Sequence, residues 1–253
     1  MAKIMAVTNQ KGGVGKTTTA INLSACLAFY KKKVLLVDID PQGNASSGMG
    51  INKNKIQRCI YDVLINQVPI DEIITSSQIK NLDVLPSTIQ LAGAEIELVT
   101  YISRENRLKH SLKPIKDKYH YIIVDCPPSL GLLTLNSLTT ADSIIIPIQC
   151  EYYALEGIGQ LLNTINLVKE NLNPSLEIEG ILFTMYDSRT NLSRDVVNEV
   201  RKYFKGRIFE SIIPRNVRVS EAPSYGKPVV VYDKNSKGAK AYRKLAKEVM
   251  SNG

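Results

Sequence analysis

Cysteine and histidine are scarce in this 253-residue sequence, which has four cysteines and two histidines. The cysteines are Cys26, Cys59, Cys126 and Cys150, and no two of them form a C-x-x-C pair. With so few histidines, no spacing typical of a zinc site is present. We therefore expect reduced, mostly buried thiols, and neither a disulfide framework nor a zinc centre.

Long apolar runs are also lacking. No stretch of about 18 apolar residues occurs, which excludes a transmembrane span. The N-terminus leads directly into an alternating apolar segment and a glycine-rich loop, so we expect no signal peptide and a cytoplasmic protein. Linkers rich in proline and serine, and internal repeats, are absent as well. We expect a single domain over residues 1–253.

Short segments rich in Val, Ile and Leu recur along the chain. Most are nearly continuous, as in parallel strands covered on both faces. We expect strands at residues 4–7, 34–40, 82–85, 121–125, 143–148, 180–183 and 208–213. Helical patterns occur at residues 16–29, 89–101, 108–116, 129–140, 155–171, 192–204 and 239–250. This alternation predicts an α/β fold with a doubly wound, mainly parallel sheet and helices on both faces.

The last of these helices has an apolar stripe, formed by Tyr242, Leu245, Ala246 and Val249, and lysines and arginine elsewhere on its surface. We interpret it as a helix packed on the core with a solvated basic face. An amphipathic tail that binds membranes is the alternative, although bulky anchors are few.

The segment NQKGGVGKTTT, between the first strand and the first helix, has the context of a phosphate-binding loop. Gly12, Gly13 and Gly15 let backbone N–H groups surround phosphate oxygens, and the helix N-terminus adds partial positive charge. We predict that Lys16 contacts the β- and γ-phosphates and that the Thr17 hydroxyl binds Mg²⁺.

The same loop departs from the usual template G-x-x-x-x-G-K-[ST] at two places. Gln10 stands where the first glycine is expected, and a second lysine, Lys11, comes five residues before Lys16. A phosphate loop with two lysines needs a separate role for the first of them.

Aspartates follow two of the expected strands. Asp125 ends YIIVD, in the Walker B position, where its carboxylate would act on Mg²⁺ through water. In VDIDPQGN, Asp38 and Asp40 flank Ile39 and would point to the same side if the strand continued. We expect one of this pair to support the metal and the other to orient a water for attack. An Asp-Pro-x-Gly turn at residues 40–43 is compatible with both roles.

The motifs K-G-G-x-G-K-T-T, D-x-D-P-Q-G-N and D-x-P-P together resemble the deviant Walker-A ATPases, and the ParA/Soj chromosome-partitioning branch in particular. The resemblance covers nearly the whole chain, including IPRNVRVSEAPSYGKP from Ile213. It implies a P-loop NTPase fold like that of the nitrogenase iron protein and the MinD-type ATPases. It also implies a homodimer that sandwiches ATP and Mg²⁺ and hydrolyses ATP slowly to ADP.

The resemblance also assigns roles to single residues. Lys11 would cross the dimer interface to the phosphates of the other subunit, which makes hydrolysis depend on dimerisation as an arginine finger does. Asp40 would position the attacking water, leaving Asp38 and Asp125 with Thr17 on the metal. The nucleotide contacts would come from Lys11, Gly12, Gly13, Val14, Gly15, Lys16, Thr17 and Thr18, with Pro214 and Asn216 at the adenine.

Positive charge is concentrated near the C-terminus. Residues 188–253 hold 15 Lys/Arg against 6 Asp/Glu, whereas the first 187 residues hold 17 against 18. The segment is largely free of Trp and Phe, which favours contacts to the phosphate backbone over base stacking. We predict a non-specific surface for double-stranded DNA. Its candidate residues are Arg189, Arg218, Arg201, Lys202 and Arg207, of which the first two match positions implicated in the resembled family.

The resemblance further implies a ParB/Spo0J-like partner that stimulates hydrolysis, and association with the nucleoid. We expect no N-terminal helix-turn-helix extension for operator binding and no stable membrane association. Three alternatives stay open: a MinD-like positioning ATPase on membranes, an iron–sulfur carrier, and a small-molecule kinase or ligase. The last two would need bridging cysteines or an acceptor pocket, and neither is recognisable in the sequence.

Overall fold

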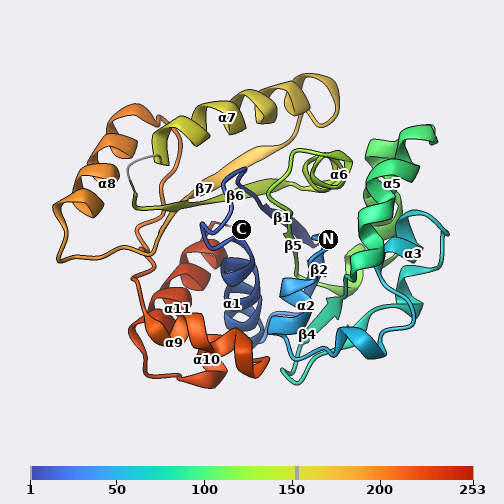
Figure 1. The fold of residues 1–253 in the computed structure, drawn as a ribbon, viewed down its shortest axis with the longest axis horizontal. Helices are drawn as coiled ribbons and strands as arrows, with labels where there is room; N and C mark the ends of the chain where they lie inside the picture. Colours follow the sequence, from blue (N-terminus) through green and yellow to red (C-terminus); the bar gives the residue numbers. More distant parts are fainter. Residues whose placement is uncertain (1, 152–153, 253) are drawn as a thin grey trace.

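A seven-stranded sheet forms the centre of the structure, a computed structural model that describes residues 2–151 and 154–252 (Figure 1). The strand order is β3-β4-β2-β5-β1-β6-β7, and every pairing is parallel except that of β3 with β4. The strands are β1 (Lys3–Val7), β2 (Val34–Asp38), β3 (Thr75–Ser76), β4 (Leu82–Leu85), β5 (Tyr121–Asp125), β6 (Ser143–Gln149) and β7 (Glu177–Thr184).

Helices cover both faces of this sheet (Figure 1). The α-helices are α1 (Lys16–Phe29), α2 (Asn44–Gly48), α3 (Ile60–Leu64), α4 (Ala94–Glu97), α5 (Arg107–Leu112), α6 (Leu132–Thr140), α7 (Ala154–Asn171), α8 (Asn191–Tyr203), α9 (Val217–Glu221), α10 (Val229–Tyr232) and α11 (Lys237–Met250). The 3-10 helices are η1 (Lys53–Lys55), η2 (Ile70–Glu72), η3 (Ile89–Gly93), η4 (Leu98–Thr100), η5 (Arg104–Asn106), η6 (Lys113–Lys118) and η7 (Ala222–Tyr225).

Two cores result, one on each face of the sheet. Because successive side chains of a strand point to opposite faces, Ile4 and Ala6 join one core and Met5 and Val7 the other. Helices α3, α5, α6, α7 and α8 bury apolar residues in the first core, and α1, α10 and α11 in the second. The predicted doubly wound, mainly parallel α/β fold is confirmed.

Two expected elements differ in the structure. Residues 208–213 run beside β7 but form no regular strand. Ile208 makes an isolated bridge with Ile181, and Ile213 N donates to Phe183 O at 2.8 Å. Between these contacts, Glu210 N and Ser211 Oγ donate to the Glu248 carboxylate of α11, which interrupts the pairing with β7. Residues 89–101 form three short pieces, η3, α4 and η4, instead of one helix. The segment buries Leu91, Ala94 and Leu98 in the core and exposes Ile96.

Helix α11 packs with its apolar stripe against α1, as predicted. Tyr242, Leu245, Ala246 and Val249 are buried in the core that also contains α1.

Among the described residues, no helix combines the length and hydrophobicity that a bilayer span requires. The four cysteines are free and buried, which confirms the prediction of reduced, mostly buried thiols.

The carboxyl ends of β1, β2 and β5 lie side by side in the middle of the sheet. Val37 is paired with Val124 and Asp38 with Asp125, while Val7 lies on the other side of Asp125. The loops that follow these three strands therefore meet at one edge, where ligands bind in open α/β sheets.

Candidate nucleotide-binding site

The loop between β1 and α1 is shaped by glycines in the left-handed region. Gly13 has φ 75° and Gly15 has φ 86°, and Gly15 is the N-cap of α1. A Cβ built at Gly12 or Gly13 would meet no protein atom within 4 Å. The loop thus leaves open space beside its backbone at the N-terminus of a 14-residue helix, an arrangement suited to an anion.

Two residues that sequence reasoning missed hold this loop in place. Asn9 donates from Nδ2 to Pro147 O at 2.8 Å and accepts from Lys11 N at 3.0 Å. Thr184, at the end of β7, donates from Oγ1 to Val14 O at 2.8 Å. A polar residue next to a glycine loop was the only sequence signal for Asn9, and none existed for Thr184, which lies 170 residues away.

Lys16 is held inside the site without a carboxylate partner. The residue is only 7% exposed, and its Nζ donates to Lys11 O at 3.1 Å. Burial lowers the pKa of Lys16, and the neighbouring carboxylates of Asp125 and Asp40 oppose that effect. Its ammonium forms no ion pair with another described residue, so its charge is available to an anionic ligand.

Asp125 is buried without any hydrogen-bond partner of ordinary geometry. Both of its carboxylate oxygens are unpaired among the described residues. Burial raises the pKa of Asp125 well above its usual range, and Asp38 and Asp40 add to the effect, whereas Thr17 and Lys16 oppose it. A buried, unpaired carboxylate is costly, and a cation bound beside it would offset that cost.

Asp38 differs from Asp125 because its oxygens are occupied. Oδ2 accepts from both the backbone N and the Oγ of Ser46 at 2.7 Å, and Oδ1 accepts from Asp40 N at 3.2 Å. Burial raises the pKa of Asp38 to about 6, despite these hydrogen bonds. Asp38 therefore fixes the start of α2 against the end of β2.

Asp40 lies in the predicted turn, just beyond the end of β2. Gly43 N donates to Asp40 O at 2.9 Å, and Gln42 N donates to Asp40 Oδ1 at 2.8 Å. Gly43 has φ 60°, and a Cβ there would lie 2.8 Å from Ser87 O, so this position requires glycine. Asp40 is 7% exposed. Its Oδ2 has no hydrogen-bond partner among the described residues.

The donor set fits Mg²⁺ held partly by a ligand. The described residues contain no group of three or more His, Cys, Asp or Glu side chains able to hold a metal by themselves. Mg²⁺ commonly binds one or two protein oxygens together with substrate phosphates and water. The orphaned carboxylate of Asp125 beside Thr17 matches that pattern.

The other predicted nucleotide contacts lie at the rim of the site. Lys11 is partly exposed, and its Nζ lies 3.9 Å from the Glu151 carboxylate. Pro214 forms an isolated bridge with Tyr186, just past the end of β7. Asn216 is the N-cap of α9, and its buried Oδ1 has no hydrogen-bond partner. This oxygen lies close to α11, since a Cβ built at Gly238 would be 3.6 Å from it.

The structure separates the five predicted DNA-binding residues into two groups. Arg189 and Arg218 follow the two segments that the Tyr186–Pro214 bridge joins. Arg201 and Lys202 lie at the other end of α8, roughly 15 Å of helix from its start. Arg207 is near them in sequence, 3.6 Å from Glu179 and over the ring of Phe209.

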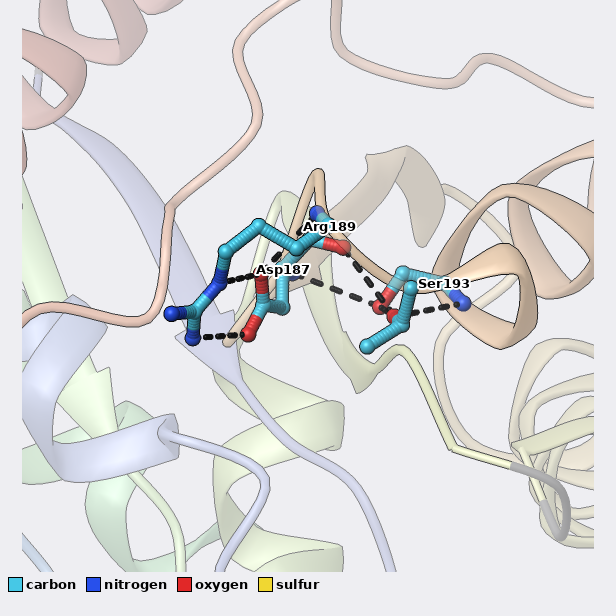
Figure 2. Close-up of polar contacts among 4 residues, drawn as sticks. Asp187, Arg189 and Ser193 are labelled. Carbon is cyan, nitrogen blue, oxygen red and sulfur yellow. Dashed lines mark hydrogen bonds and ion pairs between the residues drawn. The ribbon is translucent and has the colours of Figure 1, made fainter.

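Arg189 folds back on its own turn (Figure 2). Its Nε and Nη2 donate to the two oxygens of Asp187 at 2.9 and 2.7 Å, while its side chain stays 85% exposed. These hydrogen bonds hold the pKa of Asp187 well below its usual range. Arg218 donates from Nη1 to Glu221 at 2.9 Å. Arg218 Nε also lies 3.6 Å from Asp233, and the Arg218 side chain is about half exposed.

Comparison with known proteins places this chain. Residues 2–178 match a protein-family model described as "AAA domain". The chain is 62% identical to the sporulation initiation inhibitor protein Soj of Bacillus subtilis, with all of both chains covered. It is 57% identical to the chromosome partitioning protein ParA of Myxococcus xanthus over 99% of this chain and 88% of that one. The chain belongs to the Soj/ParA family.

A third relative and two solved structures are consistent with this family. The chromosome-partitioning ATPase Soj of Treponema pallidum is 50% identical, with 99% of this chain and 98% of that one covered. A Mycobacterium smegmatis structure named cobyrinic acid a,c-diamide synthase, with bound ADP and magnesium, is 39% identical with a TM-score of 0.89 over 100% and 95% of the chains. The cell division ATPase MinD of Pyrococcus furiosus is 26% identical with a TM-score of 0.81 over both whole chains.

These findings confirm the family resemblance and the P-loop NTPase fold expected from it. The chain is a member of a family of chromosome-partitioning ATPases. The individual site residues stay predictions, because the comparisons name no residue.

Proposed function

We propose that this protein is an ATP-dependent dimerisation switch that binds DNA non-specifically and hydrolyses ATP to drive chromosome partitioning. The observation that carries the proposal is the unpaired Asp125 carboxylate at the end of β5, beside Lys16 and the open glycine loop. Lys16 is a buried cation and Asp125 a buried anion, and neither forms an ion pair with another described residue. A nucleotide phosphate would pair with Lys16, and Mg²⁺ would pair with Asp125. Their arrangement in a Soj/ParA chain supports ATP as the nucleotide.

The nucleotide would lie along the loop from Lys11 to Thr18. Backbone N–H groups of the glycine loop would donate to phosphate oxygens, and Lys16 would neutralise the β- and γ-phosphates. Pro214 and Asn216 would contact the adenine, as the family resemblance implies.

Thr17 and Asp125 would hold Mg²⁺, with Asp38 behind them. When bound, Mg²⁺ supplies positive charge to the β- and γ-phosphate oxygens. Asp38 supports this side of the site by fixing Ser46 and the start of α2, and its negative charge adds to the attraction for a cation. The raised pKa values of Asp38 and Asp125 are the expected behaviour of carboxylates that await a cation.

Asp40 would orient the attacking water. Its Oδ1 is fixed by Gln42 N, which leaves Oδ2 to accept a hydrogen bond from water. Because the turn at 40–43 holds the carboxylate in place, the water is positioned without further ordering of the side chain.

Lys11 would act across the interface of an ATP-bound homodimer. Its only charged partner among the described residues is Glu151, at 3.9 Å and half exposed, and such a contact contributes little. The side chain is therefore free to reach the phosphates held by a second subunit, where developing negative charge would stabilise it.

DNA would bind chiefly through Arg189 and Arg218, which lie on connected segments. Asp187 leaves one guanidinium nitrogen of Arg189 without a hydrogen bond, and that nitrogen can contact a DNA phosphate. The ion pair therefore orients the guanidinium group and does not prevent it from binding DNA. Dimerisation doubles this surface and explains why DNA binding would require ATP. Arg201, Lys202 and Arg207 would contribute a second, outlying contact. We further propose a ParB/Spo0J-like stimulating partner and association with the nucleoid.

The MinD-like membrane function is the second candidate, since a MinD structure shares the fold. It would place an amphipathic C-terminal helix on a bilayer. The apolar stripe of α11 is buried against α1, so this helix has no free apolar side to offer a membrane. We therefore favour DNA.

Paired variants of the two lysines test the proposal. Lys16→Ala should abolish ATP binding, because its charge serves the nucleotide of its own subunit. Lys11→Ala should retain ATP binding but lose dimerisation and hydrolysis, by about 10²-fold or more. The measurements are equilibrium nucleotide binding, light scattering and phosphate release. If Lys11→Ala hydrolyses ATP at the unmodified rate, the role across the interface is wrong.

A further inference from the structure

A cavity of about 510 Å³ lies at the opposite edge of the sheet from the phosphate loop. Its lining includes Ile4, at the amino end of β1, and Asp142, directly before β6. The remaining walls come from α5 and η6 on one side and from the end of α6 with residues 173–175 on the other. The volume is within the range of small-molecule sites.

One wall of this cavity carries a row of basic side chains. Lys109, Lys113 and Lys116 follow one another at spacings of four and three residues, and His110 lies beside them. Side chains at these spacings share one face of a helix. Lys109, His110 and Lys113 are exposed, and none of them has a hydrogen bond or ion pair with another described residue.

The single acidic residue in the lining does not neutralise this row. Asp142 Oδ2 accepts from Ile4 N at 2.7 Å, and Asp142 pairs with Lys116 at 3.4 Å. Its charge is therefore committed to the strand end and to one lysine. Lys109 and Lys113 remain uncompensated, so the cavity favours an anion.

A buried hydroxyl on the opposite wall lacks a partner. Thr139 is 1% exposed, and its Oγ1 makes no hydrogen bond with any described residue. The neighbouring polar groups are already used. Thr140 Oγ1 donates to Asn136 O, and Asn173 Nδ2 donates to Leu138 O and Ala141 O. An orphaned hydroxyl in the lining of a cavity that also contains two unpaired lysines indicates a ligand with acceptor oxygens.

A second basic cavity shows why this one is distinctive. It has a volume of about 500 Å³ and is lined by lysines that include Lys3 and Lys118. Those two lysines are paired, Lys3 with Glu179 at 2.8 Å and Lys118 with Asp71 at 2.7 Å. Lys32 and Lys33 also line it and have no ion-pair partner among the described residues. No buried, unpaired hydroxyl lines it among the described residues. Positive charge alone therefore does not define the site.

We propose that the cavity between α5–η6 and α6 is a second ligand site, separate from the ATP site, for a small molecule that carries phosphate groups. Lys109 and Lys113 bind the phosphate oxygens as point charges, and Thr139 donates its hydroxyl to one of them. A concave cavity of this depth selects a compact anion over a DNA backbone, which needs an open surface.

Histidine NMR with inorganic pyrophosphate as the probe tests this site. The protein has two histidines, and His110 lines the proposed site whereas His120 lines the second basic cavity. The phosphate loop is first saturated with ADP and Mg²⁺. Pyrophosphate should then shift the His110 signals saturably and leave those of His120 in place. A His120→Gln variant assigns the two sets of signals.

Charge-reversal variants supply the matched control. Lys109→Glu with Lys113→Glu should weaken the His110 response by more than about tenfold, and Thr139→Val should weaken it several-fold. Lys32→Glu with Lys33→Glu, an equal charge change at the second cavity, should leave it unchanged. The proposal is overturned by equal shifts at both histidines, by no shift, or by a response that survives Lys109→Glu with Lys113→Glu. It is also overturned if duplex DNA moves the His110 signals and pyrophosphate does not.

Discussion

At the scale of single residues, Asp40 combines a fixed carboxylate with one free oxygen. Gln42 N holds Oδ1, and Oδ2 has no hydrogen-bond partner among the described residues. Neither oxygen contacts Lys16 as an ion pair, so removing the side chain should leave the phosphate-binding groups in place. Its role can therefore be separated from nucleotide binding.

Asp40→Ala should bind ATP normally and hydrolyse it about 10²–10⁴-fold more slowly, because the attacking water loses its acceptor. The dimer and its DNA complex should then persist. Nucleotide affinity and phosphate release measured on the same preparation check this. Hydrolysis at the normal rate would show that another group positions the water.

Asp125 should cost stability when no cation is bound. Burial raises its pKa, so the folded state binds the proton more tightly than the unfolded chain does. This contribution to stability is present at low pH and is lost as the pH rises through the raised pKa. Asp125→Asn should therefore stabilise the nucleotide-free protein at pH 8 by about 1–2 kcal/mol, or roughly 2–8 °C in melting temperature.

The gain from Asp125→Asn should shrink as the pH is lowered toward 5, and the variant should lose Mg²⁺-dependent hydrolysis. Thermal melts across pH, with and without Mg²⁺ and ATP, measure both effects. A variant that is less stable than the unmodified protein at pH 8 would mean that Asp125 already has a protein partner.

Individual residues of the site were predictable to different degrees. Glycines, a lysine and strand-end aspartates have spacings that reflect local backbone geometry, so Gly15, Lys16 and Asp125 could be placed from the sequence. Thr184 could not, because the chain passes through β2 to β6 between the loop and β7, which Thr184 ends. Asp38 and Asp40 would point to the same side only if the strand continued. In the structure β2 ends at Asp38, and Asp40 begins the turn at residues 40–43.

At the scale of elements, a carboxylate from one helix caps another. The N-cap of α6, Gly131, has no side chain, and Glu95 of α4 accepts instead from Leu132 N at 2.8 Å and from Leu133 N at 3.3 Å. A Cβ at Gly131 would lie 2.4 Å from Glu95 Oε1. Since α6 begins just after the loop that follows Asp125, this contact fixes the far end of that loop.

Glu95→Ala should destabilise the fold by about 0.5–2 kcal/mol, the usual effect of removing a helix cap. Glu95→Gln, which keeps an acceptor, should recover part of the loss. Glu97→Ala is the matched control, because Glu97 lies in the same short helix and its carboxylate accepts only from Tyr61 Oη among the described groups. Urea unfolding compares the three variants. Equal losses for Glu95→Ala and Glu97→Ala would contradict the capping role.

Helices and strands with continuous apolar patterns were predictable because local burial determines them. The exceptions have tertiary causes. Glu248 of α11 accepts hydrogen bonds from residues 210–211 and interrupts their pairing with β7, and no local pattern in 208–213 reports that contact. Residues 89–100 form three short helical pieces, and Gly93 ends the first of them. The two-residue strand β3 is too short to leave any periodicity.

At the scale of the whole molecule, the net charge of +8 is divided between separate surfaces. The sequence located the excess near the C-terminus, which the linear count of charges allows. It did not locate the lysines that α5 and η6 bring to the amino edge of the sheet, because acidic residues elsewhere in the first 187 residues cancel them in the count. Only the folded structure separates these lysines from the acidic residues that cancel them in the count.

If ATP joins two subunits, the Arg189 and Arg218 surfaces of both should engage one DNA duplex. Each phosphate contact releases counterions, so affinity should fall steeply as salt rises, by a logarithmic slope of about −0.9 per contact. Arg189→Ala with Arg218→Ala should weaken binding and reduce this slope while leaving ATP hydrolysis without DNA unchanged.

The most direct measurement is the affinity of the purified protein for duplex DNA with ATP, with ADP and without nucleotide, each across a salt series. We predict binding with ATP alone, with a slope that corresponds to contacts from two subunits. Equal affinity in all three states would contradict the switch.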